Sequence, residues 1–534
     1  MKNLNLEIPN IPEDEMTETV KFLFQQLSLA IEIINNQAVE IQQLKDEIAR
    51  LKGNPPKPNI RPSRLENSLD KKSVTGGSKR KNSSRKRSKN VKIDKTVTRK
   101  VTNRPKGAKT KGYREYTVQN ISVKTENILY RLENIQLPDG SFVTANLPDS
   151  VKGHFGIELQ QYILYMSYEM NISQSKIKTF LEIIGIDISD GEVNNILIKD
   201  KEKFHEEKEN ILEAGLETAN FLVTDDTGAR HGGDNGYANH IGNDFFAYFS
   251  SSDSKSRINF LKILRGKHID YILNEASTDY IKKLKISNKL RKRLSNISFK
   301  TYKDKDDWDS FVKKLGDSTK KQIKILTEAA LIGSIVEHGF NTDLVILSDE
   351  AGQFNVFLHS LCWIHAERKI NRIIPINDLE SEVIKTLEGD IWEFYQKLKA
   401  YKKNPNEAQS EKLSMEFDCI INKKSNFEAV NKALDNLYSI KKYLLLVLER
   451  PEIPLNNNIS ENDIRIYVTK RKVLGGTRSE DGRKSRDTFL SLTKTCKKLG
   501  LSFMDYLHDR LSLNNEIPSL DTIIRRQIIC RENP

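Results

Sequence analysis

The positive charge of this 534-residue chain is concentrated in one segment, and this divides the chain more sharply than any other feature. Residues 53–114 contain 21 Lys and Arg against 3 Asp and Glu, a local balance of +18; the whole chain carries +13, so the remainder carries −5. Most of this charge lies in residues 77–114, which are rich in Ser, Asn, Gly and Thr and almost free of large apolar residues. Such a composition cannot bury enough surface to fold alone, so we expect a disordered arm.

A cationic arm of this density is typical of a segment that contacts phosphates. We therefore expect the densest run to bind DNA through six side chains: Lys79, Arg80, Lys81, Arg85, Lys86 and Arg87. A solvated linker or a nuclear localisation signal would have a similar composition.

Residues 1–52 carry an apolar pattern that is typical of a coiled coil. From Met16 to Leu51, apolar side chains recur in alternating steps of three and four, and Gln37 is the one polar residue in the seam. So narrow a stripe requires a partner helix, which predicts a homo-oligomer of at least two chains. Gly53 and the prolines that follow end the pattern. The alternative is an amphipathic helix that packs on its own domain.

Cysteine usage and hydropathy limit the class of protein. The four cysteines are far apart and form no CxxC pair, which favours a reducing compartment and argues against a cysteine-based zinc finger. No stretch approaches the roughly 18 to 20 uninterrupted apolar residues that a membrane span needs. The N-terminus lacks the pattern of a secretory signal. We expect a soluble protein of the cytoplasm, associated with DNA in the bacterial nucleoid, with no membrane partner.

Residues 115–215 combine short strand-like runs with helices. YTVQNISV and GSFVTANL, on either side of a PDG turn, predict strands. GIELQQYILYM predicts a helix, and two further helices follow, with Ser173 and Ser189 as N-caps and Gly185 closing the first of the two. This pair resembles a helix-turn-helix that could enter the major groove, although ordinary helical packing fits as well.

Residues 216–534 form the predicted catalytic domain. FLVT at 221–224 and LVILS at 344–348 predict buried strands, each ending on an aspartate, and a pair of strands with a turn at Asn243-Asp244 follows the first. Two intervals, about 267–341 and 366–450, are predicted to be helical insertions. Asn458 to Lys472 predicts a helix that carries Glu461.

Three acids in this order, Asp225, Asp349 and Glu461, fit two-metal phosphoryl transfer. That chemistry needs a few carboxylates around two ions, and Mg²⁺ prefers oxygen ligands. Taken singly each acid has a structural alternative. An aspartate after a strand is commonly a helix cap or turn former, and Glu461 could complete a capping box with Asn458.

Three blocks resemble the insertion-sequence-66 family of DDE transposases. They are VTDDTGAR at 223–230, then ILSDEAGQF with LCWIHAERKI at 346–370, and IPLNNNISENDIRIYVTKRKVLGGTRSEDG at 453–482. The last block is the most specific. The resemblance implies an RNase H-like α/β core, a mixed sheet flanked by helices with helical insertions, preceded by the coiled coil and a helical DNA-binding region.

The resemblance also implies an activity and its residues. The protein would bind the ends of its own mobile element, cleave them with metal-activated water and join the 3′-OH to target DNA, with small accessory proteins of the same element as further partners. Asp225, Asp349 and Glu461 would hold two Mg²⁺ ions, for which Mn²⁺ can substitute, and no zinc is expected. Asp226 would support the site, because adjacent residues of a strand point to opposite faces.

Other residues near these blocks have supporting roles. Cys362 and His365 lie three apart, and two groups cannot close a structural zinc site, so we expect them to be structural or to lie behind the metal ligands. Further phosphate contacts are expected from six basic side chains: Arg368, Lys369, Arg465, Lys470, Arg471 and Lys472. For each of these a merely solvated charge is the alternative.

Two rival functions remain open on the sequence. An RNase H-like, structure-selective DNA nuclease would cut without joining. A DNA-binding regulator descended from a transposase would not cut at all, and the three acids argue against it.

Overall fold

The computed structural model describes residues 92–532 except 104, 149–152, 285–298, 316–318, 374 and 376–377, and for 528–532 it describes the backbone alone. These residues belong to the second of the chain's two units, Ser78–Pro534. The predicted coiled coil, the arm up to residue 91 and the six DNA contacts expected there lie outside the described residues. Across the described part, no helix is long and apolar enough to cross a membrane.

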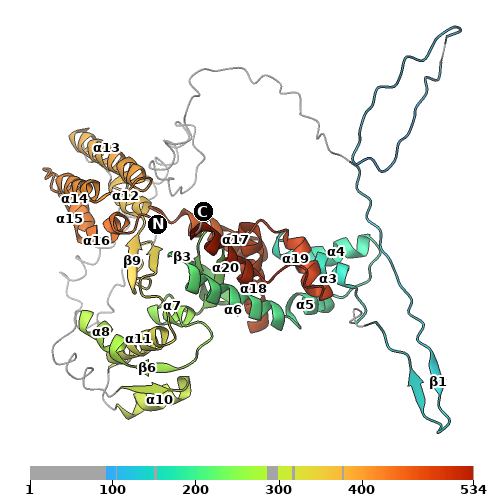
Figure 1. The fold of residues 1–534 in the computed structure, drawn as a ribbon, viewed down its shortest axis with the longest axis horizontal. Helices are drawn as coiled ribbons and strands as arrows, with labels where there is room; N and C mark the ends of the chain where they lie inside the picture. Colours follow the sequence, from blue (N-terminus) through green and yellow to red (C-terminus); the bar gives the residue numbers. More distant parts are fainter. Residues whose placement is uncertain are drawn as a thin grey trace, which may run out of the picture. The chain divides into compact units, whose positions relative to one another are not determined.

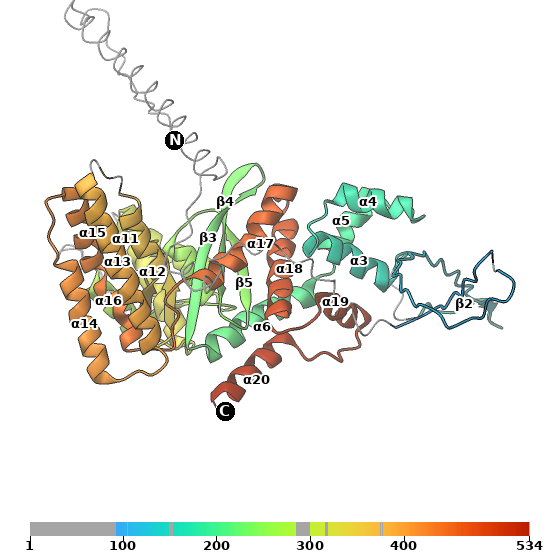
Figure 2. The same cartoon turned by 90° about the horizontal axis from the view of Figure 1, so that it is seen from above.

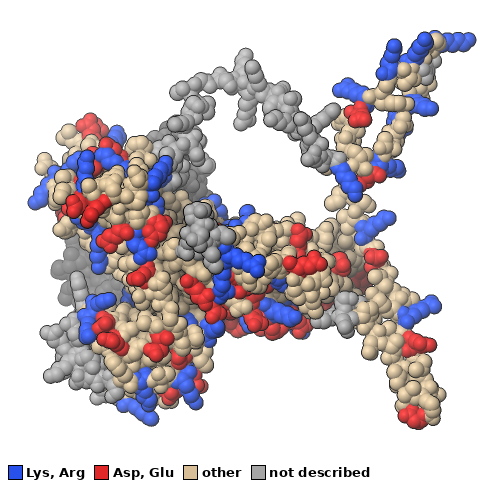
Figure 3. Space-filling view, viewed as in Figure 1, with Lys and Arg blue, Asp and Glu red and all other residues tan. Residues whose placement is uncertain are grey.

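Residues 92–148 are extended and mostly exposed, and Lys and Arg side chains are spread along them (Figure 3). One hairpin interrupts them: β1 (Asn134–Gln136) pairs antiparallel with β2 (Phe142–Thr144). The predicted strand at GSFVTANL is therefore present, but the one at 116–123 is wrong, because that segment contains no strand. Its apolar side chains have no layer to pack against, and Ile121 is 90% exposed.

Four helices follow, and the N-cap positions predicted for two of them are found. They are α3 (Ile157–Tyr168), α4 (Gln174–Ile183), α5 (Asp190–Ile198) and α6 (Glu202–Thr218). Ser189 caps α5 by accepting a hydrogen bond from the Glu192 N–H, and Gly185 follows α4 with a φ of +86°. Ser173 occupies the N-cap of α4 without a side-chain bond. The helices pack on the C-terminal part of the chain, where Tyr165 stacks on Phe503.

The predicted mixed sheet flanked by helices is confirmed as a five-stranded sheet in the order β5-β4-β3-β8-β9. Two of its strands, β3 and β9, are labelled in Figure 1. Its strands are β3 (Phe221–His231), β4 (Asp234–Gly242), β5 (Ala247–Ser252), β8 (Val345–Ser348) and β9 (Leu358–Leu361). The pairs β3–β8 and β8–β9 are parallel, and the other two are antiparallel.

The first strand is longer than the sequence predicted. We expected it to end at Thr224, but β3 continues through Asp225 and Asp226 to His231 and forms a hairpin with β4. Gly232 and Gly233, with φ of +59° and +95°, make the turn. Asp225 is therefore within a strand, whereas Asp349 directly follows β8 as predicted.

The interval 267–341 is not an all-helical insertion. It contains the two-stranded sheet of β6 (Tyr271–Leu273) and β7 (Lys300–Tyr302). Its helices, with the one that precedes it, are α7 (Arg257–Leu264), α8 (Glu275–Lys283), α10 (Lys305–Lys314) and α11 (Lys320–Glu337). Leu326, Ala329 and Leu331 of α11 share the hydrophobic core with Leu344 and Ile346, so this helix is part of the main fold.

The second of these intervals is helical. It consists of α12 (Trp363–Asn371), α13 (Asp378–Tyr401), α14 (Glu407–Ile421), α15 (Glu428–Ser439), α16 (Lys441–Leu444) and the 3₁₀ turn η2 (Leu445–Leu448). Figure 2 shows α13 to α16 side by side. Trp363 packs on Phe394 and Phe417 and joins α12 to this bundle.

Two C-terminal helices, α17 (Asn458–Leu474) and α18 (Glu480–Lys498), cover the antiparallel half of the sheet (Figure 2). The next two, α19 (Phe503–Ser512) and α20 (Leu520–Glu532), pack on α3 and α6. Helix α18 lies on β5, where Ser491 accepts a hydrogen bond from the Phe249 N–H, and α17 lies against β3 and β4.

Candidate active site

The two predicted aspartates lie at corresponding positions on neighbouring strands. The parallel pairing of β3 with β8 ends at Val223 and Leu347, and Asp225 and Asp349 each follow two residues later. Asp349 directly follows β8, so this register places both residues at the same end of the parallel pair. Beyond this point β3 pairs with β4 alone, so the edge of β3 beside Asp225 is not covered by β8.

Asn457 fixes the start of α17, and with it Glu461, next to Asp225. Its fully buried side chain donates a hydrogen bond to the carbonyl of Thr224 at 3.0 Å. Its backbone N–H donates to Sγ of Cys362 at 3.3 Å, and its carbonyl accepts from the Glu461 N–H at 3.0 Å. One residue thus connects β3, the start of α12 and the first turn of α17.

The charges of the other predicted acids act on Asp225. Burial, together with the charges of Asp349, Asp226 and Glu461, raises the pKa of Asp225 to about 7, against the hydrogen bond that Asp225 accepts from the Asp226 N–H. A carboxyl with such a pKa is costly to ionise where it stands. The structure therefore brings Asp225, Asp349 and Glu461 into one acidic cluster.

The cluster has the donor chemistry of a divalent cation site. Its ligands would be carboxylate oxygens, which hard cations such as Mg²⁺ prefer, and it has an excess of negative charge that a cation would relieve. Among the residues that the structure describes, however, no three His, Cys, Asp or Glu side chains are arranged so that they could hold one ion together.

Glu461 does not belong to a capping box. The N-cap of α17 is Asn457, Asn458 is the first helical residue, and no side-chain capping bond is formed. The carboxylate of Glu461 lies instead 3.9 Å from Nε2 of His365 and 3.8 Å from Nη1 of Arg368. The capping-box alternative with Asn458 is therefore wrong, since the hydrogen-bonding of Asn457 to Thr224 moves the helix start one residue earlier.

Cys362 and His365 lie behind this cluster on the start of α12. Cys362 is buried, burial raises the pKa of its thiol to about 11, and its sulfur accepts from the Asn457 N–H. Nε2 of His365 is 3.2 Å from Nη1 of Arg368. Burial lowers the pKa of His365, and the charge of Arg368 lowers it further.

Asp226 is held by two residues that the sequence did not suggest. Its carboxylate forms an ion pair with Lys255, and its other oxygen accepts a hydrogen bond from Nε2 of Gln353 at 2.6 Å. Its side chain is only 3% exposed. Lys255 was missed because it lies in a polar turn, DSKS, that resembles any solvated loop.

The predicted phosphate contacts near the site differ in their surroundings. Lys470 is 2% exposed, its ammonium donates to the carbonyl of Ser167, and it lies over the ring of Tyr168. It therefore cannot contact DNA, and that prediction is wrong: helical spacing turns it inward, whereas Arg465 and Lys472 are exposed. The remaining three have protein partners: Lys369 pairs with Glu350, Arg471 donates to the carbonyl of Gly228, and Arg368 lies beside Glu461.

A second polar cluster lies on the inner side of α17. His240, opposite Asp225 in the β3–β4 pairing, is fully buried, and its Nδ1 is 2.7 Å from Oγ of Ser460. Nε2 of His240 is 3.1 Å, and Nζ of Lys498 2.6 Å, from Oδ2 of Asp463. The sequence around His240 and Lys498 does not predict this cluster.

The chain is similar to known sequences over part of its length. The model of a family described as Transposase IS66 family matches residues 344–485. An uncharacterized protein, y4jO, from Sinorhizobium fredii (strain NBRC 101917 / NGR234) is 41% identical over 308 residues, which are 57% of this chain and 96% of that relative.

Proposed function

This chain belongs to the transposase IS66 family, and from that premise we propose that it is a DNA transposase in which Asp225, Asp349 and Glu461 are the catalytic acids. It would cleave phosphodiester bonds at the ends of a mobile element and join the freed 3′-OH to target DNA. The family membership indicates a transposase-type nuclease or transferase; the residues and the chemistry are our proposal.

The observation that carries this assignment is the acidic cluster itself. Burial, and the charges of acids at the end of β8 and in the first turn of α17, raise the pKa of Asp225 in β3 to about 7. A fold gains no stability from a carboxylate that is buried beside other acids. Strongly perturbed acids of this kind are typical of functional sites.

Transposases of this family generally use divalent metals, and the donor set here suits Mg²⁺, with Mn²⁺ as a substitute. When bound, a pair of such ions would activate the attacking oxygen and stabilise the leaving oxygen. Asp225, Asp349 and Glu461 would hold the ions. Asn457 would hold the first turn of α17 against Thr224, the residue before Asp225. His365 and Arg368 would orient the Glu461 carboxylate.

The partners follow from the same proposal. DNA would bind to the basic arm at 53–114, including Lys79, Arg80, Lys81, Arg85, Lys86 and Arg87, and near the site to Arg368, Lys369, Arg465, Arg471 and Lys472. The coiled coil at 1–52 would pair two or more chains, as a reaction on two DNA ends requires. The protein would act in the cytoplasm on the nucleoid, with small accessory proteins of the same element.

The substitution Glu461→Gln tests the assignment. A neutral amide binds a hard cation far less well than a carboxylate does, so cleavage and strand transfer should be lost almost completely. Because Glu461 makes no capping bond, the melting temperature should stay within a few degrees and the protein should still bind element ends. The measurements are cleavage and joining of labelled DNA ends in Mg²⁺, together with thermal unfolding.

Glu407→Gln, in the first turn of α14 and away from the cluster, makes the same chemical change and should leave activity intact. A Glu461→Gln protein that cuts at nearly the wild-type rate would remove Glu461 from the site. Cleavage without joining would identify a nuclease instead, and a wild-type protein that binds DNA but never cuts it would identify a regulator.

A further inference from the structure

Lys255 and Asp226 form an ion pair at the edge of the acidic cluster. The carboxylate belongs to β3 and is 3% exposed, whereas the lysine side chain, from the loop between β5 and α7, is 47% exposed. The second oxygen of Asp226 accepts from Gln353, four residues beyond Asp349. Asp226 therefore uses both oxygens to hold protein groups and is poorly suited to bind a metal ion.

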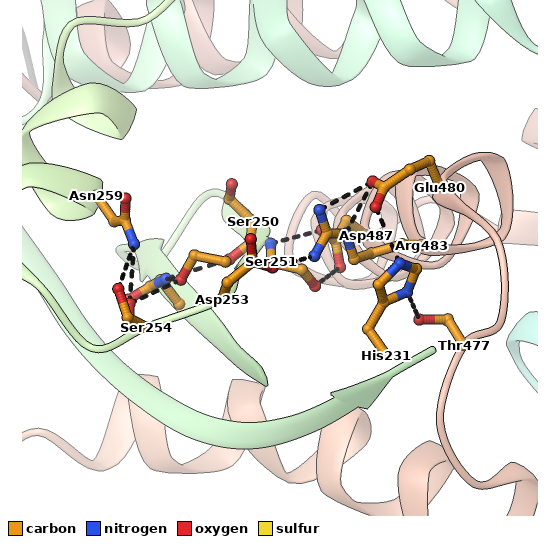
Figure 4. A network of polar contacts seen from close by, with 12 residues as sticks. His231, Ser250, Ser251, Asp253, Ser254, Asn259, Thr477, Glu480, Arg483 and Asp487 are labelled. Carbon is orange, nitrogen blue, oxygen red and sulfur yellow. Dashed lines mark hydrogen bonds and ion pairs between the residues drawn. The ribbon is translucent and has the colours of Figure 1, made fainter. Parts of the chain in front are cut away.

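The two residues before Lys255, Asp253 and Ser254, are each held by a hydrogen bond, and Figure 4 shows these contacts. Nδ2 of Asn259 donates to the carbonyl of Ser254 at 2.9 Å. Nη1 of Arg483 in α18 donates to Asp253 at 2.7 Å. These two contacts hold the backbone just before Lys255, so they keep the base of the lysine side chain in place.

The ammonium of Lys255 is close enough to the cluster to be influenced by it. Burial by itself would lower the pKa of Lys255, but the hydrogen bond and charge of Asp226, followed by the charges of Asp225 and Asp349, raise it above its ordinary value. An ammonium has three N–H donors, and the pair with Asp226 uses one. Since about half of the side chain is exposed, the ammonium can hold Asp226 and a further acceptor together.

A site made of carboxylates repels the phosphate on which it acts, and a fixed cation at the edge of the site offsets this repulsion. We propose that Lys255 binds a non-bridging oxygen of the DNA phosphate that enters the acidic cluster, and that Asp226 positions Lys255 for this contact. The inference rests on the proposed function, because it takes DNA as the substrate of this site.

The competing interpretation is that Lys255 merely neutralises Asp226. The two interpretations differ in what the loss of the lysine does to DNA binding. A neutralising lysine acts on stability alone, whereas a phosphate contact acts on affinity and only while the phosphate is charged.

The experiment is a double-mutant cycle between the protein and one phosphate. Binding is measured in Mg²⁺ with Glu461→Gln protein, which leaves DNA uncut, on a duplex carrying the terminal repeat that flanks this gene. The phosphate at the cleavage position is either normal or replaced by an uncharged methylphosphonate. Lys255→Met and Lys255→Arg are compared, and Lys423→Met, which removes a similarly exposed lysine paired with Asp390, is the control.

We expect Lys255→Met to weaken binding to the normal duplex by about five- to tenfold, as for one charged contact at a half-exposed position. The methylphosphonate should cost the parent protein a similar factor and should cost Lys255→Met nothing further. Lys255→Arg should retain most of the affinity, and Lys423→Met should behave as the parent.

Independent, multiplicative penalties, an unchanged affinity of Lys255→Met, or a parent that tolerates the methylphosphonate would each overturn the contact. So would a loss that follows the melting temperature of the variants. Failure of the proposed function has a separate signature: wild-type protein that does not cleave the same duplex in Mg²⁺, whatever the cycle shows.

Discussion

Asp225 lies in β3, and Asp463 lies in α17, the helix that packs against β3 and β4. Their surroundings shift the pKa values of these two acids in opposite directions. Burial and the charges of other acids raise the pKa of Asp225 to about 7. Burial also raises the pKa of Asp463, but His240 and Lys498 outweigh it and hold the pKa at about 2. His240 is the residue opposite Asp225 in the β3–β4 pairing, and Asp463 follows Glu461 by two residues.

Under the proposed function, one helix serves both the stability of the fold and its chemistry. The charge of Asp463 is matched by the lysines at 494 and 498 of α18, so this cluster attaches α17 to the fold. The charge of Asp225 has like charges around it and makes the folded state less stable unless a cation is present. Active sites typically reduce the stability of the fold, as the charges around Asp225 do here. The ion pairs of Asp463 offset this loss.

Asp225→Asn should give the largest effect on activity and an opposite effect on stability. Cleavage should fall by at least about a hundredfold, the size typical of losing one electrostatic stabiliser of a transition state. The folded-state pKa is raised from 3.8 to about 7, so in the wild-type protein stability should fall as pH rises through this window and the penalty is complete above it. At pH 8 without metal, the variant should therefore unfold with a free energy higher by on the order of 1 kcal/mol.

Urea unfolding at pH 5 and pH 8 measures this, and the stability gain should shrink at the lower pH. Asp279→Asn, which removes an exposed acid of α8, is the control and should change neither property. An Asp225→Asn protein less stable than wild type at pH 8 would mean that the acidic cluster is compensated after all.

Asp463→Asn should reverse this pattern. Removing one partner of a buried ion pair costs about 3 to 5 kcal/mol, because Lys498 is left without its counter-charge. The wild-type contribution of Asp463 is present at neutral pH and is lost as pH falls from about 4 towards 2, since its folded-state pKa is lowered. Unfolding in urea at pH 7 measures the loss. Variant protein that remains folded should keep the catalytic rate within a few-fold, and a rate as low as that of Asp225→Asn would end the distinction between the two sides.

Part of this arrangement was predictable from the sequence and part was not. The strand before Asp349 and the helix around Glu461 have clear apolar patterns, so both acids could be placed on the right elements. The second half of β3, DDTGARH, has no alternation of apolar residues because it pairs on one side only, and its end was therefore predicted too early.

The contacts of the site could not be predicted because they join distant parts of the chain. Asp226 meets Lys255 and Gln353, which lie 29 and 127 residues later, and no local pattern encodes such pairs. The same holds for His240 with Ser460. Helix α11 was predicted to belong to an insertion because the whole interval 267–341 is basic and polar, although the apolar run AALIGSIV in its second half is typical of a buried helix.

The smallest of these effects should come from Lys470, which lies on the buried side of α17. Burial lowers its pKa from 10.5 to about 7, so the folded protein binds this proton more weakly than the unfolded chain does. The cost is therefore complete below pH 7 and is relieved as pH rises from about 7 to 10.5, and stability should rise over that window. Lys470→Met should remove this slope and raise the unfolding free energy at pH 6 by about 1 kcal/mol, because the gain from not burying a charge is reduced by the lost bond to Ser167.

Lys472→Met, which changes an exposed lysine two residues later, should leave stability unchanged and weaken DNA binding slightly. Urea unfolding at pH 6 and pH 9, with DNA affinity measured alongside, distinguishes the two lysines. The contrary outcome is a Lys470→Met protein that loses DNA affinity while its unfolding free energy keeps the wild-type dependence on pH. That result would mean that Lys470 contacts DNA, and that α17 is not divided into one face for chemistry and one for stability.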